Sequence, residues 1–248
     1  NTSYDVKIYD IVKDDIYGKF NLEGRGEKRP ILTGNESLSL GAIAGGLDCY
    51  YGYPMTPASS ILHFLADYQD EFNLAVVHPE SELAVINMAI GSSFSGAKSM
   101  IGTSGGGFAL MVEGFSLAGM SEAPVLCILS MRPGPATGIP TYTEQADLQF
   151  ALNAGHGDFL RIVASPGTIY EAYFLASEML DLVWKFQTPG ILLTEKHLSE
   201  SHMTVSLDIE NARWAEPKLY KEEGEYKRYL DTDDGISPLK FPPSEQLI

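Results

Sequence analysis

Apolar residues in the middle of the chain alternate between short continuous runs and longer stretches in which they recur at helical spacing. The continuous runs are typical of buried strands and lie at 74–78, 98–104, 124–130, 159–164 and 190–195. The helical stretches lie at 57–70, 80–97, 106–120, 144–152 and 168–186, and a further helix is expected to lead from Gly34 into a strand before Tyr53. Short apolar strands separated by helices are typical of parallel sheets, so we predict an α/β fold whose parallel sheet has helices on both faces.

The helix predicted at 57–70 has a recognisable start signal in the segment TPASS. Thr56 is a typical N-cap residue, and Pro57 suits the first helical position because an N–H there has no partner within the helix. Ile61 and Leu65 then fall on one face, as expected for a helix packed on a sheet. Thr56 therefore has a sufficient structural role, in which its hydroxyl binds its own helix.

The chain changes character near both ends, which predicts three parts. Residues 1–30 are polar and charged without a sustained apolar period, and we interpret them as a leader or linker. Residues 31–207 form the predicted α/β domain. Residues 208–248 are charged, interrupted by prolines and without period, which indicates a linker or a surface-wrapping tail toward a following domain.

The charge balance argues against nucleic acid as a partner. Seventeen Lys and Arg residues face 33 Asp and Glu residues, a formal net charge of −16, so the basic patch of a nucleic-acid binder is not expected. No apolar run reaches the roughly 18 residues that a membrane span requires, and the first residues lack the pattern of a signal peptide. We expect a soluble, cytoplasmic protein without a membrane partner.

The sequence predicts no metal site in this chain. Cys49 and Cys127 are the two cysteines, and without a CxxC pair they favour neither a disulfide framework nor a zinc or iron–sulfur site. The five histidines show no HExxH spacing, and His197 and His202 are too far apart in sequence for a common helical face. Any redox metal is therefore expected on another chain.

Candidate chemistry lies where predicted strands give way to helices, because open α/β sheets bind ligands at the carboxyl ends of their strands. Four such junctions are distinctive: YPMTPAS at 53–59, HPESE at 78–82, GTSGGG at 102–107 and SMRPGPATGIPT at 130–141. The glycines of GTSGGG lack the spacing of the known phosphate loops, which leaves nucleotide binding a minor alternative to close backbone packing.

The charged residues at these junctions each have a functional and a structural interpretation. Arg132 precedes a rigid Pro/Gly loop, where its guanidinium either binds a small carboxylate or pairs with an acid such as Glu144. Glu80 and Glu82 flank a predicted helix start, where the helix dipole favours carboxylates without any catalytic role. Position in the sequence leaves these alternatives open.

Taken in order, the four junctions resemble the thiamine-diphosphate-dependent 2-oxoacid:ferredoxin (or flavodoxin) oxidoreductases, in the pyrimidine-binding domain of the α subunit. YPMTPAS is similar to the family's YPITPSS, GTSGGGFALMVE to its GTSGPGFSLM-E segment, and RPGPATGIPTYTEQADL to its R-x-GP-S/A-TG-PT-x-x-x-QxDL. The helix sequence ESELAVINMAIGSSFSGA is similar to the family's helix that carries the cofactor-activating glutamate, and RYLDTDDGISP at 228–238 to the junction before the next domain. The resemblance covers about residues 31–240.

The resemblance implies a role for each matched residue. Glu82 aligns with the carboxylate that hydrogen-bonds the aminopyrimidine ring and so promotes ylid formation, and Gly105 lies in the cofactor-binding glycine loop. Thr56 and Arg132 align with the hydroxyl and the guanidinium that hold the 2-oxoacid carboxylate. Met55 stands where the family usually has Ile, next to the substrate threonine, where it is placed to affect which 2-oxoacid fits.

The resemblance also implies what the chain obtains from elsewhere. The GDG…Asn pattern that binds the diphosphate through Mg²⁺ is not found, so a β subunit is expected to carry that domain, the Mg²⁺ and the [4Fe–4S] cluster. The expected reactants are a 2-oxoacid, CoA and oxidised ferredoxin or flavodoxin, and the chain, expected to be a segment of a longer subunit, is inactive alone. Two alternatives remain: a non-catalytic assembly subunit of such a complex, and a nucleotide-binding α/β protein.

Overall fold

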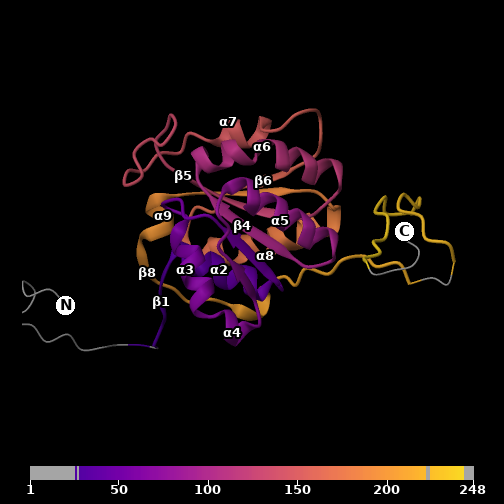
Figure 1. Cartoon of the computed structure of the whole chain (residues 1–248). Helices are drawn as coiled ribbons and strands as arrows, with labels where there is room; N and C mark the ends of the chain where they lie inside the picture. The colour runs from indigo at the N-terminus through magenta and orange to yellow at the C-terminus, as the bar shows by residue number, and fades with distance from the viewer. Residues whose placement is uncertain (1–25, 27, 222–223, 243–248) are drawn as a thin grey trace, which may run out of the picture.

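A computed structural model of the chain describes residue 26 and residues 28–221 and 224–242. Within it, six strands form one sheet in the order β3-β2-β4-β5-β7-β6, and every neighbouring pair is parallel (Figure 1). The strands are β2 (Cys49–Gly52), β3 (Ala75–Val77), β4 (Ser99–Thr103), β5 (Val125–Met131), β6 (Ile162–Ala164) and β7 (Gly190–Glu195). The predicted α/β fold with a parallel sheet is confirmed.

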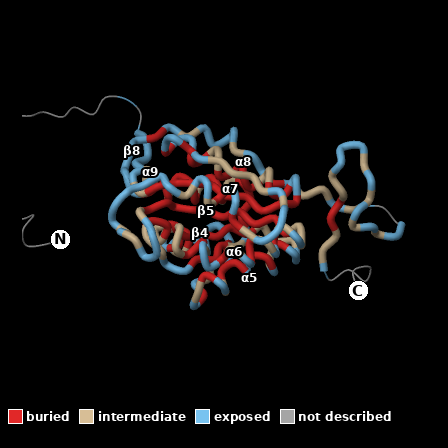
Figure 2. The backbone as a smooth tube through the Cα atoms, turned by 90° about the horizontal axis from the view of Figure 1, so that it is seen from above, coloured by how far each residue is buried: buried red, intermediate tan, exposed pale blue. Residues whose placement is uncertain are grey.

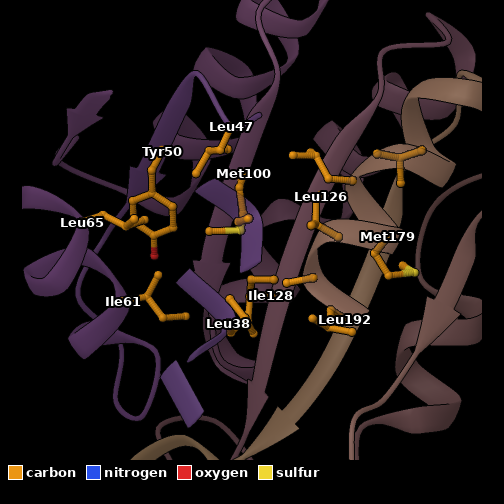
Figure 3. Packing of buried hydrophobic residues seen from close by; sticks show 14 of the residues in the cluster. Leu38, Leu47, Tyr50, Ile61, Leu65, Met100, Leu126, Ile128, Met179 and Leu192 are labelled. Carbon is orange, nitrogen blue, oxygen red and sulfur yellow. The ribbon is translucent and has the colours of Figure 1, made fainter. Parts of the chain in front are cut away.

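Helices cover both faces of the sheet, as the apolar pattern predicts (Figure 2). One face carries α2 (Gly34–Ala44), α3 (Ser59–Asp67) and α8 (Ile169–Phe186); the other carries α5 (Glu82–Phe94), α6 (Gly105–Met120) and α7 (Leu148–Asn153). Successive strand residues belong to opposite layers: Leu126 packs with α8 (Figure 3), whereas Cys127 packs with α6. All residues of β4 and β5 are buried, which explains why these strands are continuously apolar in sequence.

The predicted helix at 57–70 begins later than expected and is divided. It consists of α3 and the short α4 (Gln69–Phe72), and a turn at 56–58 precedes it. Thr56 is not the N-cap: Ala58 occupies that position without a side-chain hydrogen bond, and the Thr56–Pro57 peptide is cis. The Thr56 carbonyl instead accepts a hydrogen bond from Arg132, a contact that helix start signals do not reveal.

Two other predicted elements are shorter than expected. The helix predicted at 144–152 is α7, which begins only at Leu148. The strand predicted at 159–164 is the three-residue β6, because the Leu160 carbonyl accepts a hydrogen bond from the Thr188 hydroxyl at 2.6 Å instead of pairing with a neighbouring strand. Both shortened elements follow the loop at 132–147, which lies at one end of the sheet (Figure 1).

Several elements were not predicted from the sequence. The strands β1 (Ile31–Thr33) and β8 (His202–Thr204) pair antiparallel in a separate two-stranded sheet. A five-residue helix, α9 (Lys196–Glu200), directly follows β7, and a short 3-10 helix, η1, spans Ile209–Asn211. Of these elements, α9 matters for the site because it starts at the carboxyl end of a central strand.

The segment after η1 packs on the domain through a few aromatic and polar contacts. The ring of Trp214 lies against Gly46 and under the Lys98 ammonium, and Phe241 contacts Trp184 edge-to-face. The segment leaves the domain on the side away from the 132–147 loop (Figure 1). The division at residues 30 and 207 stays a prediction, and most of the proposed leader lies outside the described residues.

Two kinds of feature are absent from the described part of the chain. No helix in it combines the length and the apolar character needed to cross a membrane. No cluster of three or more His, Cys, Asp or Glu side chains in it is arranged to hold a metal ion.

Candidate functional site

The topology directs attention to the carboxyl ends of β2 and β4. From β2 the chain moves outward to β3 and then returns to the other side of β2 to form β4, so the strand order reverses at this pair. Ligands of open α/β sheets bind at such a switch point. Because all six strands are parallel, the segments after β2, β3, β4 and β5, which carry the four sequence motifs, meet at this edge.

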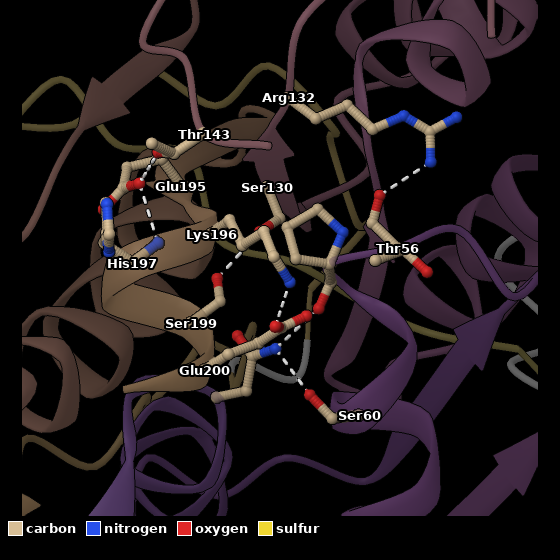
Figure 4. A network of polar contacts seen from close by, with 12 residues as sticks. Thr56, Ser60, Ser130, Arg132, Thr143, Glu195, Lys196, His197, Ser199 and Glu200 are labelled. Atoms are coloured by element: carbon tan, nitrogen blue, oxygen red, sulfur yellow. Dashed lines mark hydrogen bonds and ion pairs between the residues drawn. The ribbon is translucent and has the colours of Figure 1, made fainter. Parts of the chain in front are cut away.

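Arg132 and Thr56 are brought together here from positions 76 residues apart. Nη1 of Arg132 donates to the Thr56 carbonyl at 2.8 Å (Figure 4). Nη2 donates to the Thr137 carbonyl at 2.8 Å. The two carbonyl groups fix the plane of the guanidinium. The hydroxyl of Thr56 makes no hydrogen bond within the described residues, so it is not occupied by its own backbone as the N-cap interpretation required.

The charge of Arg132 is not compensated by a neighbouring acid. The residue is 7 % exposed, and it forms no ion pair with Glu144 or with any other carboxylate of the described chain. Burial lowers the pKa of this guanidinium, because desolvation disfavours the charged form. A cation held by two neutral carbonyls has remaining N–H donors, and these suit a small carboxylate.

Glu82 is the first residue of α5 and is 5 % exposed. The preceding Ser81 caps the helix by accepting a hydrogen bond from the Ala84 N–H at 3.3 Å, so the Glu82 side chain is not needed as the cap. Among the described residues its carboxyl group has no hydrogen-bond or ion-pair partner. Neither oxygen of this carboxyl is fully buried, so the group is open to a partner in a ligand.

Three successive glycines at the start of α6 lie at the centre of this site. A Cβ at Gly105 would lie 2.8 Å from Oδ2 of Asp147, and one at Gly106 would lie 3.1 Å from the Ala136 carbonyl oxygen and 3.8 Å from the methyl of Met55. A Cβ at Gly107 would approach Oε1 of Glu82 to 3.0 Å. Successive helical residues point about 100° apart, so each glycine faces a different wall of the site. The loop is therefore built for close approach rather than as a phosphate loop.

Asp147 and Ser104 were not recognised as site residues from the sequence. Oδ2 of Asp147 and the hydroxyl of the fully buried Ser104 are both buried without a hydrogen-bond partner. Burial, together with repulsion from Glu144, raises the pKa of the Asp147 carboxyl. Asp147 stands in the quoted QADL segment, but only the fold shows that its carboxyl group reaches the first turn of α6.

Glu195 is a second residue that sequence reasoning missed. It is the last residue of β7 and the N-cap of α9, and its carboxylate accepts hydrogen bonds from the N–H groups of His197 and Leu198, each at 2.8 Å. The hydroxyl of Thr143 also donates to this carboxylate (Figure 4). Burial by itself raises the pKa of Glu195, but these hydrogen bonds outweigh it and lower the pKa overall. The sequence feature that could have identified Glu195 is its position, since it ends a buried strand at the same edge of the sheet as the four motifs.

The arrangement offers two functions side by side. Arg132 and Thr56 present a guanidinium and a free hydroxyl, which is a typical arrangement for binding a carboxylate. Glu82 presents a buried carboxyl against a glycine helix start, which suits hydrogen bonding to a flat ring nitrogen. The structure thus places the predicted residues Thr56, Glu82, Gly105 and Arg132 at one edge of the sheet, while their roles stay predictions.

Comparison with known proteins identifies the same region. The family model described as "Pyruvate flavodoxin/ferredoxin oxidoreductase, thiamine diP-bdg" matches residues 40–244. The α subunit of 2-oxoacid:ferredoxin oxidoreductase from Saccharolobus solfataricus is 43 % identical over 230 residues, which cover 86 % of this chain and 36 % of that subunit. The 2-oxoglutarate synthase subunit KorA from Archaeoglobus fulgidus is 36 % identical, with 83 % of this chain and 57 % of that subunit covered.

A solved structure shows the same fold at high similarity. It is a 2-oxoglutarate:ferredoxin oxidoreductase from Magnetococcus marinus with 2-oxoglutarate, coenzyme A and succinyl-CoA bound. The TM-score is 0.88 at 34 % identity, and the match covers 98 % of this chain and 44 % of that chain. The chain therefore spans less than three fifths of the length of these relatives.

Proposed function

The chain belongs to the pyruvate flavodoxin/ferredoxin oxidoreductase family, in which it is a thiamine-diphosphate-binding α-subunit domain, and from this premise we propose what its site does. The proposed reaction of the assembled enzyme converts a 2-oxoacid, CoA and oxidised ferredoxin to an acyl-CoA, CO₂ and reduced ferredoxin. This chain supplies the pyrimidine-binding half of the cofactor site and the groups that bind the 2-oxoacid carboxylate. It is inactive without the partner that binds the diphosphate.

The observation that carries the proposal is a pair of uncompensated charged side chains at one edge of the sheet. Glu82 and Arg132 are 5 % and 7 % exposed, and neither forms an ion pair within the described residues. A charged side chain that is largely removed from water is stabilised when a ligand supplies an opposite charge or a hydrogen bond. The carboxylate of a 2-oxoacid at Arg132 and the ring nitrogen of the cofactor at Glu82 would supply these partners.

The residues fit the aminopyrimidine end of thiamine diphosphate. When bound, the cofactor supplies the carbon nucleophile that attacks the keto group and accepts the electrons released by decarboxylation. Glu82 holds a proton at the ring nitrogen, and the absence of a side chain at Gly107 leaves room for the Glu82 carboxyl beside the start of α6. Gly105 and Gly106 allow Asp147 and the Ala136 carbonyl to lie close to the helix start, where a Cβ would collide with them.

Arg132 and Thr56 orient the substrate. The guanidinium binds the 2-oxoacid carboxylate through N–H groups not used for the two carbonyls, and the Thr56 hydroxyl adds a further donor. Their binding to the carboxylate aligns the bond that breaks when CO₂ leaves. Met55, whose methyl lies near Gly106, borders this position and is placed to contact the substrate side chain.

A partner subunit is proposed to carry the diphosphate site, the Mg²⁺ and the [4Fe–4S] cluster. The surface of α5 and α6 favours such a partner, because six large apolar side chains on these two helices are exposed. They are Leu83, Met88, Phe94, Leu110, Leu117 and Met120. Exposed apolar patches of this kind are typical of protein interfaces, and a partner on this surface would cover the residue next to Glu82.

The test uses the full-length subunit co-purified with its partners. It measures thiamine diphosphate binding in the presence of Mg²⁺ and 2-oxoacid-dependent ferredoxin reduction. We expect Glu82→Gln to lower 2-oxoacid-dependent ferredoxin reduction about 100-fold or more, because general acid–base groups contribute about 10²–10⁴-fold. Glu80→Gln is the matched control, since Glu80 is exposed and carries the same charge two residues earlier. Arg132→Lys is expected to raise the KM for the 2-oxoacid about 10-fold or more while cofactor affinity is unchanged.

Full activity of Glu82→Gln would contradict the proposed role. If the intact complex binds no thiamine diphosphate, the chain is better explained as a non-catalytic assembly subunit. Binding of ATP or NAD by the wild-type protein, lost when the glycine loop at 102–107 is altered, would favour the nucleotide-binding alternative.

A further inference from the structure

The loop that follows β5 is attached to the rest of the fold at very few points. Residues 133–146 are mostly exposed, and their backbone hydrogen bonds stay within the loop, such as Ile139 N–H to the Pro133 carbonyl at 3.0 Å. Among the hydrogen bonds of the described residues, two join this stretch to residues outside it: the Thr143 hydroxyl donates to the Glu195 carboxylate, and Arg132 donates to the Thr137 carbonyl. A segment with so few attachments depends on each of them for its position.

Glu195 is a rigid anchor for this contact. It ends the fully buried strand β7 and is itself 9 % exposed, and two N–H groups of α9 hold its carboxylate in place. The helix is in turn attached to β5, because the Ser199 and Ser130 hydroxyls hydrogen-bond at 2.8 Å (Figure 4). Thr194 of β7 also donates to Ser130, at 2.9 Å. Ser130 lies two residues before Arg132, so α9 is linked to both sides of the loop.

The loop position affects Arg132 directly. Nη2 of Arg132 donates to the Thr137 carbonyl, which belongs to the loop, so a displaced loop moves one of the two acceptors that orient the guanidinium. Behind the loop there is space rather than packing: a cavity of about 380 Å³ separates Thr141 and Tyr142 from α9. The Thr143–Glu195 hydrogen bond lies at the edge of this cavity and joins the loop to the start of α9.

We propose that Glu195 is a positioning residue of the site: through Thr143 it holds loop 132–147 where the Arg132 guanidinium meets the substrate carboxylate. The identity of that substrate as a 2-oxoacid rests on the proposed function above. Glu195 touches neither substrate nor cofactor, and it acts through the loop. A purely structural role, in which Glu195 only caps α9, predicts no effect of Thr143 on substrate binding.

The decisive variant is Thr143→Val, because it removes the donor, keeps the side-chain shape and leaves the two α9 hydrogen bonds of Glu195 intact. Thr143→Ser keeps the hydroxyl, and Glu200→Gln is the matched control, since it neutralises a carboxylate on α9 that pairs with Lys196 and not with the loop. The variants are made in the full-length subunit and purified with its partners. Two readouts are taken: steady-state kinetics with pyruvate, 2-oxoglutarate or 2-oxoisovalerate, whichever the wild type turns over, and hydrogen exchange of the backbone amides at 133–146.

We expect Thr143→Val to raise the KM for the 2-oxoacid about 10-fold with kcat changed less than about 2-fold, and Thr143→Ser and Glu200→Gln to behave as the wild type. Amides at 133–146 are expected to exchange faster in Thr143→Val, whereas those of α9 are unchanged. An unchanged KM together with unchanged exchange at 133–146 would overturn the inference. If the wild type turns over none of the three 2-oxoacids, the proposed function fails, and the exchange of the loop still decides whether Glu195 anchors it.

Discussion

Gly107, in the first turn of α6, has no room for a side chain. A Cβ there would lie 2.1 Å from the hydroxyl oxygen of Thr103 and 3.0 Å from Oε1 of Glu82. Thr103 is fully buried and β-branched, so it has few other rotamers to adopt. We expect Gly107→Ala to force Thr103 and Glu82 apart, which lowers the free energy of unfolding and displaces the carboxyl group proposed to bind the cofactor.

The magnitude follows from two opposing effects. Insertion of a methyl group into a well-packed core costs about 1–3 kcal/mol, and a contact of 2.1 Å with a stiff side chain belongs near the upper limit. Replacement of glycine by alanine in a helix returns up to about 1 kcal/mol, because the unfolded chain loses freedom. The net change expected for Gly107→Ala is a loss of about 2 kcal/mol in the free energy of unfolding.

Gly91 provides the matched control on the neighbouring helix α5. It is exposed, and a Cβ built there has no heavy atom within 4 Å. Alanine has a higher helix propensity than glycine, and at position 91 its Cβ collides with nothing. Gly91→Ala is therefore expected to raise the free energy of unfolding by up to about 1 kcal/mol. The two variants should differ by about 3 kcal/mol, or roughly 6–12 °C in Tm for a chain of this size.

Urea unfolding followed by tryptophan fluorescence and by far-UV circular dichroism measures the difference. Trp184 is fully buried and reports on the core, whereas Trp214 is 64 % exposed. The reasoning would be refuted if Gly107→Ala unfolded at the same urea concentration as the wild type, or at a higher one. A loss of equal size in Gly91→Ala would show that the effect belongs to helix glycines in general and not to the site.

Two further predictions concern titrating groups. Because the folded protein raises the pKa of Asp147 above its ordinary value of 3.8, the Asp147 carboxyl stabilises the fold at low pH and loses that contribution as the pH rises through the folded pKa. Asp147→Asn is accordingly expected to raise the free energy of unfolding at pH 7, with the difference disappearing as the pH falls toward 4, as urea titrations at several pH values would show; a difference independent of pH would contradict this. Burial raises the pKa of the Cys127 thiol, so iodoacetamide at pH 8 should modify Cys127 only after unfolding, whereas the half-buried Cys49 should react measurably in the native protein; mass spectrometry of the peptides distinguishes the two.

Local sequence patterns predicted the sheet and its two covering layers. Strands such as β5 are buried on both faces, so their residues are apolar without interruption, and that property depends only on the identities of neighbouring residues. The order of elements along the chain also implied that the four motifs share one edge, because parallel strands present their carboxyl ends together. Arg132 was a candidate on this ground before its contacts were known.

Capping and strand limits near the site were predicted less well. Thr56 has the chemistry of an N-cap, but the structure uses its carbonyl for Arg132, which is 76 residues away in the sequence. The Thr188 hydroxyl shortened β6 by binding the Leu160 carbonyl from 28 residues away. In both cases a long-range hydrogen bond outweighed a local preference of about 1 kcal/mol.

The sequence by itself determined which residues are apolar, where the chain turns, and which charged groups stand at the ends of strands, because these depend on near neighbours. Only the tertiary structure decided which of those groups lack partners. Glu82 and Arg132 are distinguished by uncompensated burial, and Glu195 by a bond to Thr143 across 52 residues of chain. Burial and partnership arise from the packing of distant segments, so no local pattern encodes them, and the proposed chemistry of this site depends on them.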